Sequence, residues 1–135
     1  MSSADDPRRA DPTSDVPATL TFPDGLVGFP HLHGFTLDEV EGTAFVELRS
    51  DDDAELGFVA ASADDIRPGM TGELVGRGLV ASGSVVLVLL SVHGDPPEAT
   101  ANLAGPIVVE PGTATARQLV LEDATYPLRA PIGGA

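Results

Sequence analysis

Glycine and proline interrupt this 135-residue chain about once every five residues. The sequence has 15 glycines and 12 prolines, 27 residues in all. Glycine loses more conformational entropy than other residues when it is ordered, and proline has no amide hydrogen to donate, so neither continues a long helix. The sequence therefore predicts short strands joined by many turns. A chain of this length typically forms one domain with a single hydrophobic core.

The longest apolar run identifies the centre of that core. Val85 to Leu90 contains six consecutive apolar residues, so a strand here has no polar face and must be covered on both sides. Residues 19–22 alternate polar and apolar side chains, which is typical of a strand with one buried face. Further strands are expected at Gly34 to Val40, Ala44 to Arg49, Leu56 to Ala61 and Ile107 to Val109.

Four other segments give weaker signals. Ser62 to Asp65 has capping-box spacing, and Pro68 would end a helix begun there within two turns. Asp95 is placed to cap one helical turn begun by the following prolines. The glycines within 70–84 indicate weak strand pieces. Residues 117–124 fit either a strand or one face of a helix, and periodicity alone does not decide.

The count of eight or nine strands predicts an all-β fold, either a small antiparallel barrel-like structure or a two-sheet sandwich, with one or two short helical turns. Residues 1–17 are rich in Asp and Pro and nearly lack large apolar side chains. Such a segment cannot bury enough apolar area to offset the entropy lost on ordering. We expect a disordered acidic tail over 1–17 and a single β domain over 18–135.

The charge balance excludes some partners. There are 21 acidic residues against seven basic ones, a formal net charge of −14, so the field of the domain repels phosphate backbones and direct nucleic-acid binding is not expected. The chain has no cysteine, which excludes disulfides and thiolate metal sites. No apolar run is long enough to span a bilayer. We expect a cytoplasmic protein that does not bind membranes.

Candidate chemistry is sparse. His31 and His33 would share one face of a strand and would hold a metal with a third ligand, but a surface turn after Pro30 is the simpler interpretation. Asp51 to Glu55 lacks the Gly and Glu positions of a calcium loop and is interpreted as a hairpin tip. Gly76 to Ala81 fits G-x-G-x-x-A, yet no helix follows it to bind a pyrophosphate. We therefore expect no catalytic, cofactor-binding or metal-binding residues.

Three stretches in order carry a signature. They are Phe22 to Pro30 (FPDGLVGFP), Thr100 to Val109 (TANLAGPIVV), and Arg117 to Leu121 (RQLVL) followed by Tyr126 and by Arg129 to Pro131. These stretches resemble the flagellar assembly factor FliW family, whose members show F-P-x-G-x-x-G-F, T-x-N-L-x-A-P-I and K/R-Q-x-V-L followed by a Tyr. The resemblance runs from about Phe22 to Ile132.

The resemblance implies a non-catalytic, β-barrel-like protein that binds newly made flagellin. It also implies that the protein binds CsrA, an RNA-binding translational repressor, and antagonises it so that flagellin synthesis follows export. It favours a strand over Arg117 to Glu122. Two rival hypotheses are a barrel module with an unknown ligand and a small metal- or sugar-dependent enzyme that uses His31, His33 or His93.

The signature residues are Phe22, Pro23, Gly25, Gly28, Phe29, Asn102, Leu103, Pro106, Gln118 and Tyr126. The glycines permit left-handed or close backbone, and the two phenylalanines would pack across the turn. Asn102 and Gln118 are expected to bond loop backbone, and Tyr126 to anchor the C-terminal segment. The chain departs from the family pattern in residues 11–17, where an apolar strand is usual, and in residues 63–70.

Overall fold

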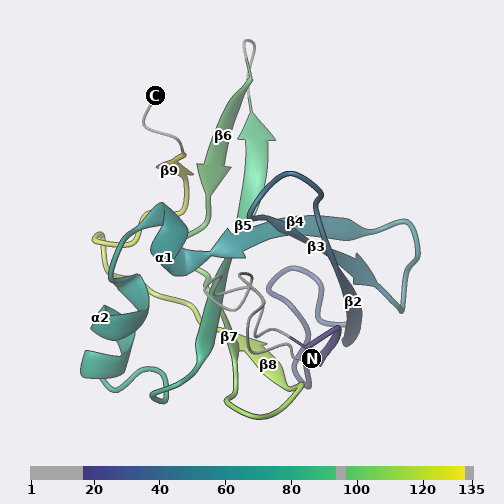
Figure 1. Cartoon of the computed structure of the whole chain (residues 1–135), viewed down its shortest axis with the longest axis horizontal. Coiled ribbons are helices and arrows are strands. Elements are labelled where there is room, and N and C mark those ends of the chain that lie inside the picture. Colours follow the sequence, from purple (N-terminus) through teal and green to yellow (C-terminus); the bar gives the residue numbers. More distant parts are fainter. Residues whose placement is uncertain (1–16, 94–96, 133–135) are drawn as a thin grey trace, which may run out of the picture.

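The computed structural model describes residues 17–93 and 97–132, and these form nine strands and two short helices (Figure 1). The strands are β1 (Thr19–Thr21), β2 (Gly34–Glu39), β3 (Val46–Ser50), β4 (Gly57–Ser62), β5 (Val85–His93), β6 (Glu98–Ala101), β7 (Ile107–Val109), β8 (Ala116–Gln118) and β9 (Ala130–Pro131). The helices are α1 (Ala63–Ile66) and α2 (Met70–Gly76).

Seven strands form a ring. Strands β1 to β5 pair antiparallel in chain order, β1 with β2 through to β4 with β5. Strand β7 then pairs antiparallel with β5 on one side and with β8 on the other. A parallel bridge between Thr21 and Thr115 joins the start of the ring to the residue before β8. Strands β6 and β9 branch from β5 outside this ring. The result is a nearly closed antiparallel barrel, which confirms the predicted all-β class.

Strand β5 separates two hydrophobic clusters. Leu87 is fully buried and packs inside the ring, with Leu89 packed against the same cluster. Val86 and Val88 pack outside the ring, beneath α2 and the C-terminal segment. The prediction that this apolar run is covered on both faces is confirmed.

The prediction of strand pieces in residues 70–84 is wrong, because Met70–Gly76 is helix α2. Met70 and Leu74 are one helical turn apart and both are fully buried, so one apolar face outweighs the helix-breaking tendency of the glycines. Gly72 and Gly76 lie on the exposed side. The short helix expected near residue 62 is α1, but the side chain of Ser62 makes no capping hydrogen bond.

The ambiguous segment 117–124 begins as a strand, which ends at Gln118, and contains no helix. β8 covers Ala116–Gln118, and the chain stays extended beyond it, because the Leu119 and Leu121 amides donate to the carbonyls of Pro106 and Ala104. This agrees with the family resemblance and excludes the helix. Strand β6 was not predicted. The helical turn expected at Asp95, and residues 1–16 of the expected tail, lie outside the described residues.

Candidate functional site

The side chain of Gln118 joins the three signature stretches. Its Oε1 accepts a hydrogen bond from the Val27 amide at 2.8 Å, and its Nε2 donates to the Gly105 carbonyl at 2.9 Å. The Asn102 Oδ1 accepts from the Gly105 amide at 2.9 Å. Both amide side chains therefore bond loop backbone, as expected from the sequence. We call Asn102, Gly105 and Gln118 the amide node.

The loop of the first stretch is a tight turn with a crowded interior. The Leu26 and Phe29 backbones exchange two hydrogen bonds. Gly25 has φ of +71°, and a Cβ there would lie 2.5 Å from the Pro30 carbonyl oxygen. Gly28 has φ of +86° and faces open space. Both glycines therefore adopt the left-handed conformation that the sequence predicted, and Gly25 also permits the close approach of the Pro30 backbone.

The two phenylalanines of this loop contact different aromatic side chains of the barrel. Phe22 is fully buried, with its centroid 5.3 Å from that of Phe35. Phe29 lies edge-on to Phe58 with centroids 5.5 Å apart. Both phenylalanines pack with the interior cluster. They anchor the loop to the barrel through these neighbours.

Tyr126 anchors the C-terminal segment, as expected from the sequence, and its partner is α2. Its hydroxyl donates to Glu73 Oε1 at 2.8 Å, and the Arg67 and Arg77 guanidinium carbons lie 5.2 and 5.8 Å from its ring centroid. The hydrogen bond from Tyr126 and the nearby Arg67 lower the pKa of Glu73. Burial, together with the bond to Glu73, raises the pKa of Tyr126. We call Arg67, Glu73, Arg77 and Tyr126 the tyrosine latch.

The acidic segment after β3 is a hairpin tip, as predicted. Asp52 Oδ2 accepts from the His33 and Gly34 amides at 2.8 and 2.9 Å, and Asp51 Oδ1 accepts from the Thr36 hydroxyl at 2.8 Å. The two backbone hydrogen bonds lower the pKa of Asp52. These two carboxylates therefore join the β3–β4 turn to the start of β2.

The histidines of the H-x-H motif take local roles. His33 Nδ1 lies 2.9 Å from the Phe22 carbonyl oxygen, and the His31 ring lies against Phe29. Within residues 17–93 and 97–132, no group of three or more His, Asp or Glu side chains is arranged to hold a metal ion. The side chain of His93 is outside the described part of the structure.

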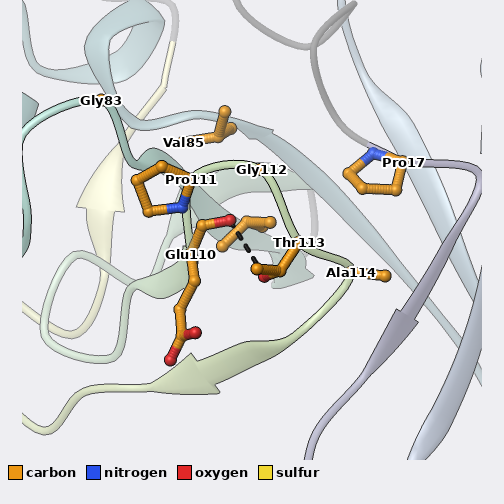
Figure 2. A pocket seen from close by; sticks show the side chains of 9 residues that line it. Pro17, Gly83, Val85, Glu110, Pro111, Gly112, Thr113 and Ala114 are labelled. Atoms are coloured by element: carbon orange, nitrogen blue, oxygen red, sulfur yellow. Dashed lines mark hydrogen bonds between the residues drawn. The ribbon is translucent and has the colours of Figure 1, made fainter.

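A hollow of about 480 Å³ lies beside the β7–β8 turn (Figure 2). Its lining includes Pro17, Gly83, Val85 and the turn residues 110–114. Glu110 is its one ionisable lining residue, and the Thr113 hydroxyl bonds to the Glu110 carbonyl at 3.1 Å. General acid–base chemistry requires positioned proton-transfer groups, and a single carboxylate in an open hollow does not supply a pair.

The comparisons with known proteins agree on one family. The family model described as FliW protein matches residues 5–132. The chain belongs to the FliW family. It is 34% identical to the flagellar assembly factor FliW of Symbiobacterium thermophilum, over 82% of this chain and 86% of the relative. It is 33% identical to that of Geobacter sulfurreducens, over 83% and 74% of the two chains.

The fold agrees with a solved member of the family. A crystal structure of the flagellar assembly factor FliW superposes with a TM-score of 0.69 at 25% identity, covering 84% of both chains. The ring of strands and the two helices described above are therefore a FliW-family architecture. No helix in the described ranges is long and apolar enough to cross a membrane.

Most of the FliW signature lies in the scaffold. Phe22, Leu103 and Pro106 are buried, whereas Pro23 and Gly28 are exposed. The exposed apolar side chains nearby are Val27, at 63% exposure, and Val120, at 68%. Sequence reasoning missed both valines. The available signals were the position of Val27 between two turn glycines and the alternation of Val120 with two packed leucines.

These two valines form a candidate binding surface. Gln118 bonds the Val27 amide and lies two residues before Val120 along an extended chain, so the amide node brings the loop and the strand end together. We call Val27, Gly28 and Val120 the signature surface. Contiguous exposed apolar patches mark contact sites for protein partners, whereas single exposed valines are common, so this surface is a candidate through its place in the signature.

Charge is distributed unevenly over the domain. Residues 34–57, which include β2 and β3, carry eight carboxylates and one arginine. Residues 97–132 together with 63–93 carry seven carboxylates and four arginines. The side of the barrel built from β2 and β3 is therefore the more acidic, which gives a FliW-family domain a directional field.

Proposed function

We propose that this chain binds flagellin and CsrA in the cytoplasm, and that its binding to CsrA relieves repression of flagellin synthesis. It acts by binding and not by catalysis. Membership of the FliW family carries this proposal, because the family match spans residues 5–132. The convergence of the three signature stretches on the amide node supports it, since that node holds the signature surface in place.

The acidic field supports a role toward an RNA-binding partner. Proteins that bind RNA present basic surfaces to phosphate, and complementary fields raise association rates by about 10–1000-fold. A bound domain of charge −14 would also weaken RNA binding by placing negative charge near the phosphate path, without occupying the RNA groove. Flagellin needs neither effect, so its affinity should depend less on ionic strength.

The test measures association of the purified chain with CsrA and with flagellin from about 50 to 500 mM salt, where the screening length falls from roughly 14 to 4 Å. We expect the CsrA on-rate to fall strongly with salt and the flagellin affinity to change less. Absence of micromolar binding to both partners would overturn the proposal and favour a barrel module with another ligand.

Matched variants locate the charge effect. Asp38→Asn with Glu41→Gln removes two carboxylates from the acidic side, and Glu110→Gln with Glu122→Gln removes two elsewhere, so both double variants change the net charge equally. The first should slow CsrA association more than the second. Equal slowing would leave only the net charge as the cause.

A further inference from the structure

The outer face of the sheet carries a row of paired residues that changes from charged to apolar. Glu47 of β3 lies opposite Val59 of β4, which lies opposite Leu90 of β5. Val92 follows Leu90 by two residues, so it shares this face, and its partner on β6 is Ala99. We call Val59, Leu90, Val92 and Ala99 the fork surface.

The fork surface extends the apolar cluster outside the ring beyond the helices that cover that cluster. Leu90 packs against the outer cluster and is half-buried. Farther along the same face, Val59 is 38% exposed and Val92 is 70% exposed, and Ala99 is also exposed. The apolar face of the sheet therefore extends beyond its own helical cover.

Strands β4 and β5 separate at this position. Their register ends at the pair Val59 and Leu90, while β5 continues to His93 paired only with β6 in the described structure. Figure 1 shows β4 extending to the right of its crossing with β5, whereas β5 and β6 project upward as a two-stranded ribbon. The edge of β5 that faces β4 is therefore unpaired beyond Leu90.

The backbone at Val92 points toward this open edge. The Leu89 carbonyl accepts from the Asn102 amide, which follows β6, so Leu89 directs its backbone groups toward β6. Successive residues of a strand direct these groups to opposite sides, so Leu90 and Val92 direct theirs toward β4. Val92 thus presents an exposed apolar side chain together with an amide and a carbonyl ready for another strand.

We propose that the fork surface binds an extended segment of the basic RNA-binding partner, which pairs with β5 at Val92 and places an apolar side chain between Val59 and Val92. This inference rests on the proposed function and names the surface and the mode of binding. An unpaired strand edge selects an extended peptide over a helix, because strand addition satisfies the main-chain groups that the edge leaves open.

Charge selects the basic partner. Glu47 lies opposite Val59 in this row and pairs with Arg49 at 3.0 Å. Residues 34–57 carry seven further carboxylates and no other arginine. A peptide that lies in the fork with Lys or Arg beside its apolar residue would place those cations against this side.

Three variants of the full chain test the proposal, with circular dichroism melting to verify folding. Val92→Asp inserts a charge into the apolar contact. Val92→Pro keeps an apolar side chain and removes the outward amide, a position where an edge strand tolerates proline. Leu128→Asp is the control, because Leu128 is 61% exposed and lies in the segment before β9, outside the fork surface. Calorimetry gives the Kd of each for CsrA and for flagellin.

We expect both Val92 variants to bind CsrA at least about tenfold more weakly, with Leu128→Asp and all flagellin affinities within about twofold of wild type. Unchanged CsrA binding by Val92→Asp would overturn the surface, and unchanged binding by Val92→Pro alone would overturn strand pairing. Loss of flagellin binding instead would assign the fork to the other partner and overturn the choice of occupant. If the wild-type chain binds neither protein, the proposed function itself is overturned. If the wild-type chain binds both proteins and the Val92 variants bind them equally well, only the fork proposal is overturned.

Discussion

The two sides of β5 are held together by different means. Inside the ring, Leu87 packs with Phe35 and Leu48, side chains that come from strands far apart in the sequence. Outside the ring, Val88 packs with Leu74 from a seven-residue helix and with Tyr126 from an irregular segment. Strand pairing covers the first cluster, whereas the second depends on two short elements held by the tyrosine latch.

This difference predicts two levels of stability. Opening the interior cluster requires breaking the ring, so its exposure should cost the full free energy of unfolding. The outer cluster can open by release of α2 and the C-terminal segment while the ring stays paired, as in the local openings that hydrogen exchange detects. The variants below compare the two sides, from the largest expected effect to the smallest.

Leu87→Ala should have the largest effect. Leu87 is fully buried in the ring, and removing a buried leucine side chain typically costs about 2–5 kcal/mol. Leu89→Ala should cost less, because Leu89 is half-buried. Urea denaturation measures both. A loss below about 1 kcal/mol for Leu87→Ala would show that the interior is not the main core.

Gln118→Ala should destabilise the domain next most. It leaves the Gly105 carbonyl, in a part-buried position, without its side-chain partner, and an unsatisfied buried polar group costs about 1–3 kcal/mol. The Val27 amide is exposed, so water replaces its bond to Gln118. Val120→Ala is the control and should stay within about 0.5 kcal/mol of wild type, since its side chain is mostly exposed. Equal losses in the two variants would argue against the amide node as a structural junction.

The interior side could be predicted from the sequence, and the outer side only in part. The run from Val85 to Leu90 has no polar face, so a doubly covered strand follows from its composition. Helix α2 could not be found this way, because its apolar face has only Met70 and Leu74 fully buried and Gly72 lies between them. Short helices take their stability from tertiary packing, which the local sequence does not show.

The candidate site could also be predicted from the sequence only in part. The roles of Asn102, Gln118 and Tyr126 followed from their residue types, because amides and phenols need partners when they are placed in turns or packed segments. The signature surface and the fork surface could not be predicted from residue types. Val92 follows the apolar run Val85 to Leu90 after one serine, and its exposure follows from the separation of β4 from β5, which the sequence does not show.

Tyr126→Phe should have a smaller effect, confined to the outer side. It removes the hydrogen bond to Glu73 and keeps the ring buried between the two arginines. We expect a loss of about 1 kcal/mol and faster hydrogen exchange in α2, with exchange in β2 and β3 changed only as far as global stability falls. Equal acceleration in the ring and in α2 would mean that the two sides open together.

Glu73→Gln should have the smallest effect, visible only as a change in pH dependence. Glu73 has an ordinary pKa of 4.5, which the hydrogen bond from Tyr126 and then Arg67 lower in the folded state. The unfolded chain therefore binds this proton more tightly, so the stabilisation is present above pH 4.5 and is lost as pH falls through the lower folded pKa. The glutamine keeps an acceptor for Tyr126 and does not titrate. Melting temperatures from pH 3 to 7 should fall less steeply for Glu73→Gln than for wild type, and this difference should shrink in a Tyr126→Phe background, because the largest cause of the shift is absent there. Parallel profiles for wild type and Glu73→Gln would show that the latch does not couple the outer side to pH.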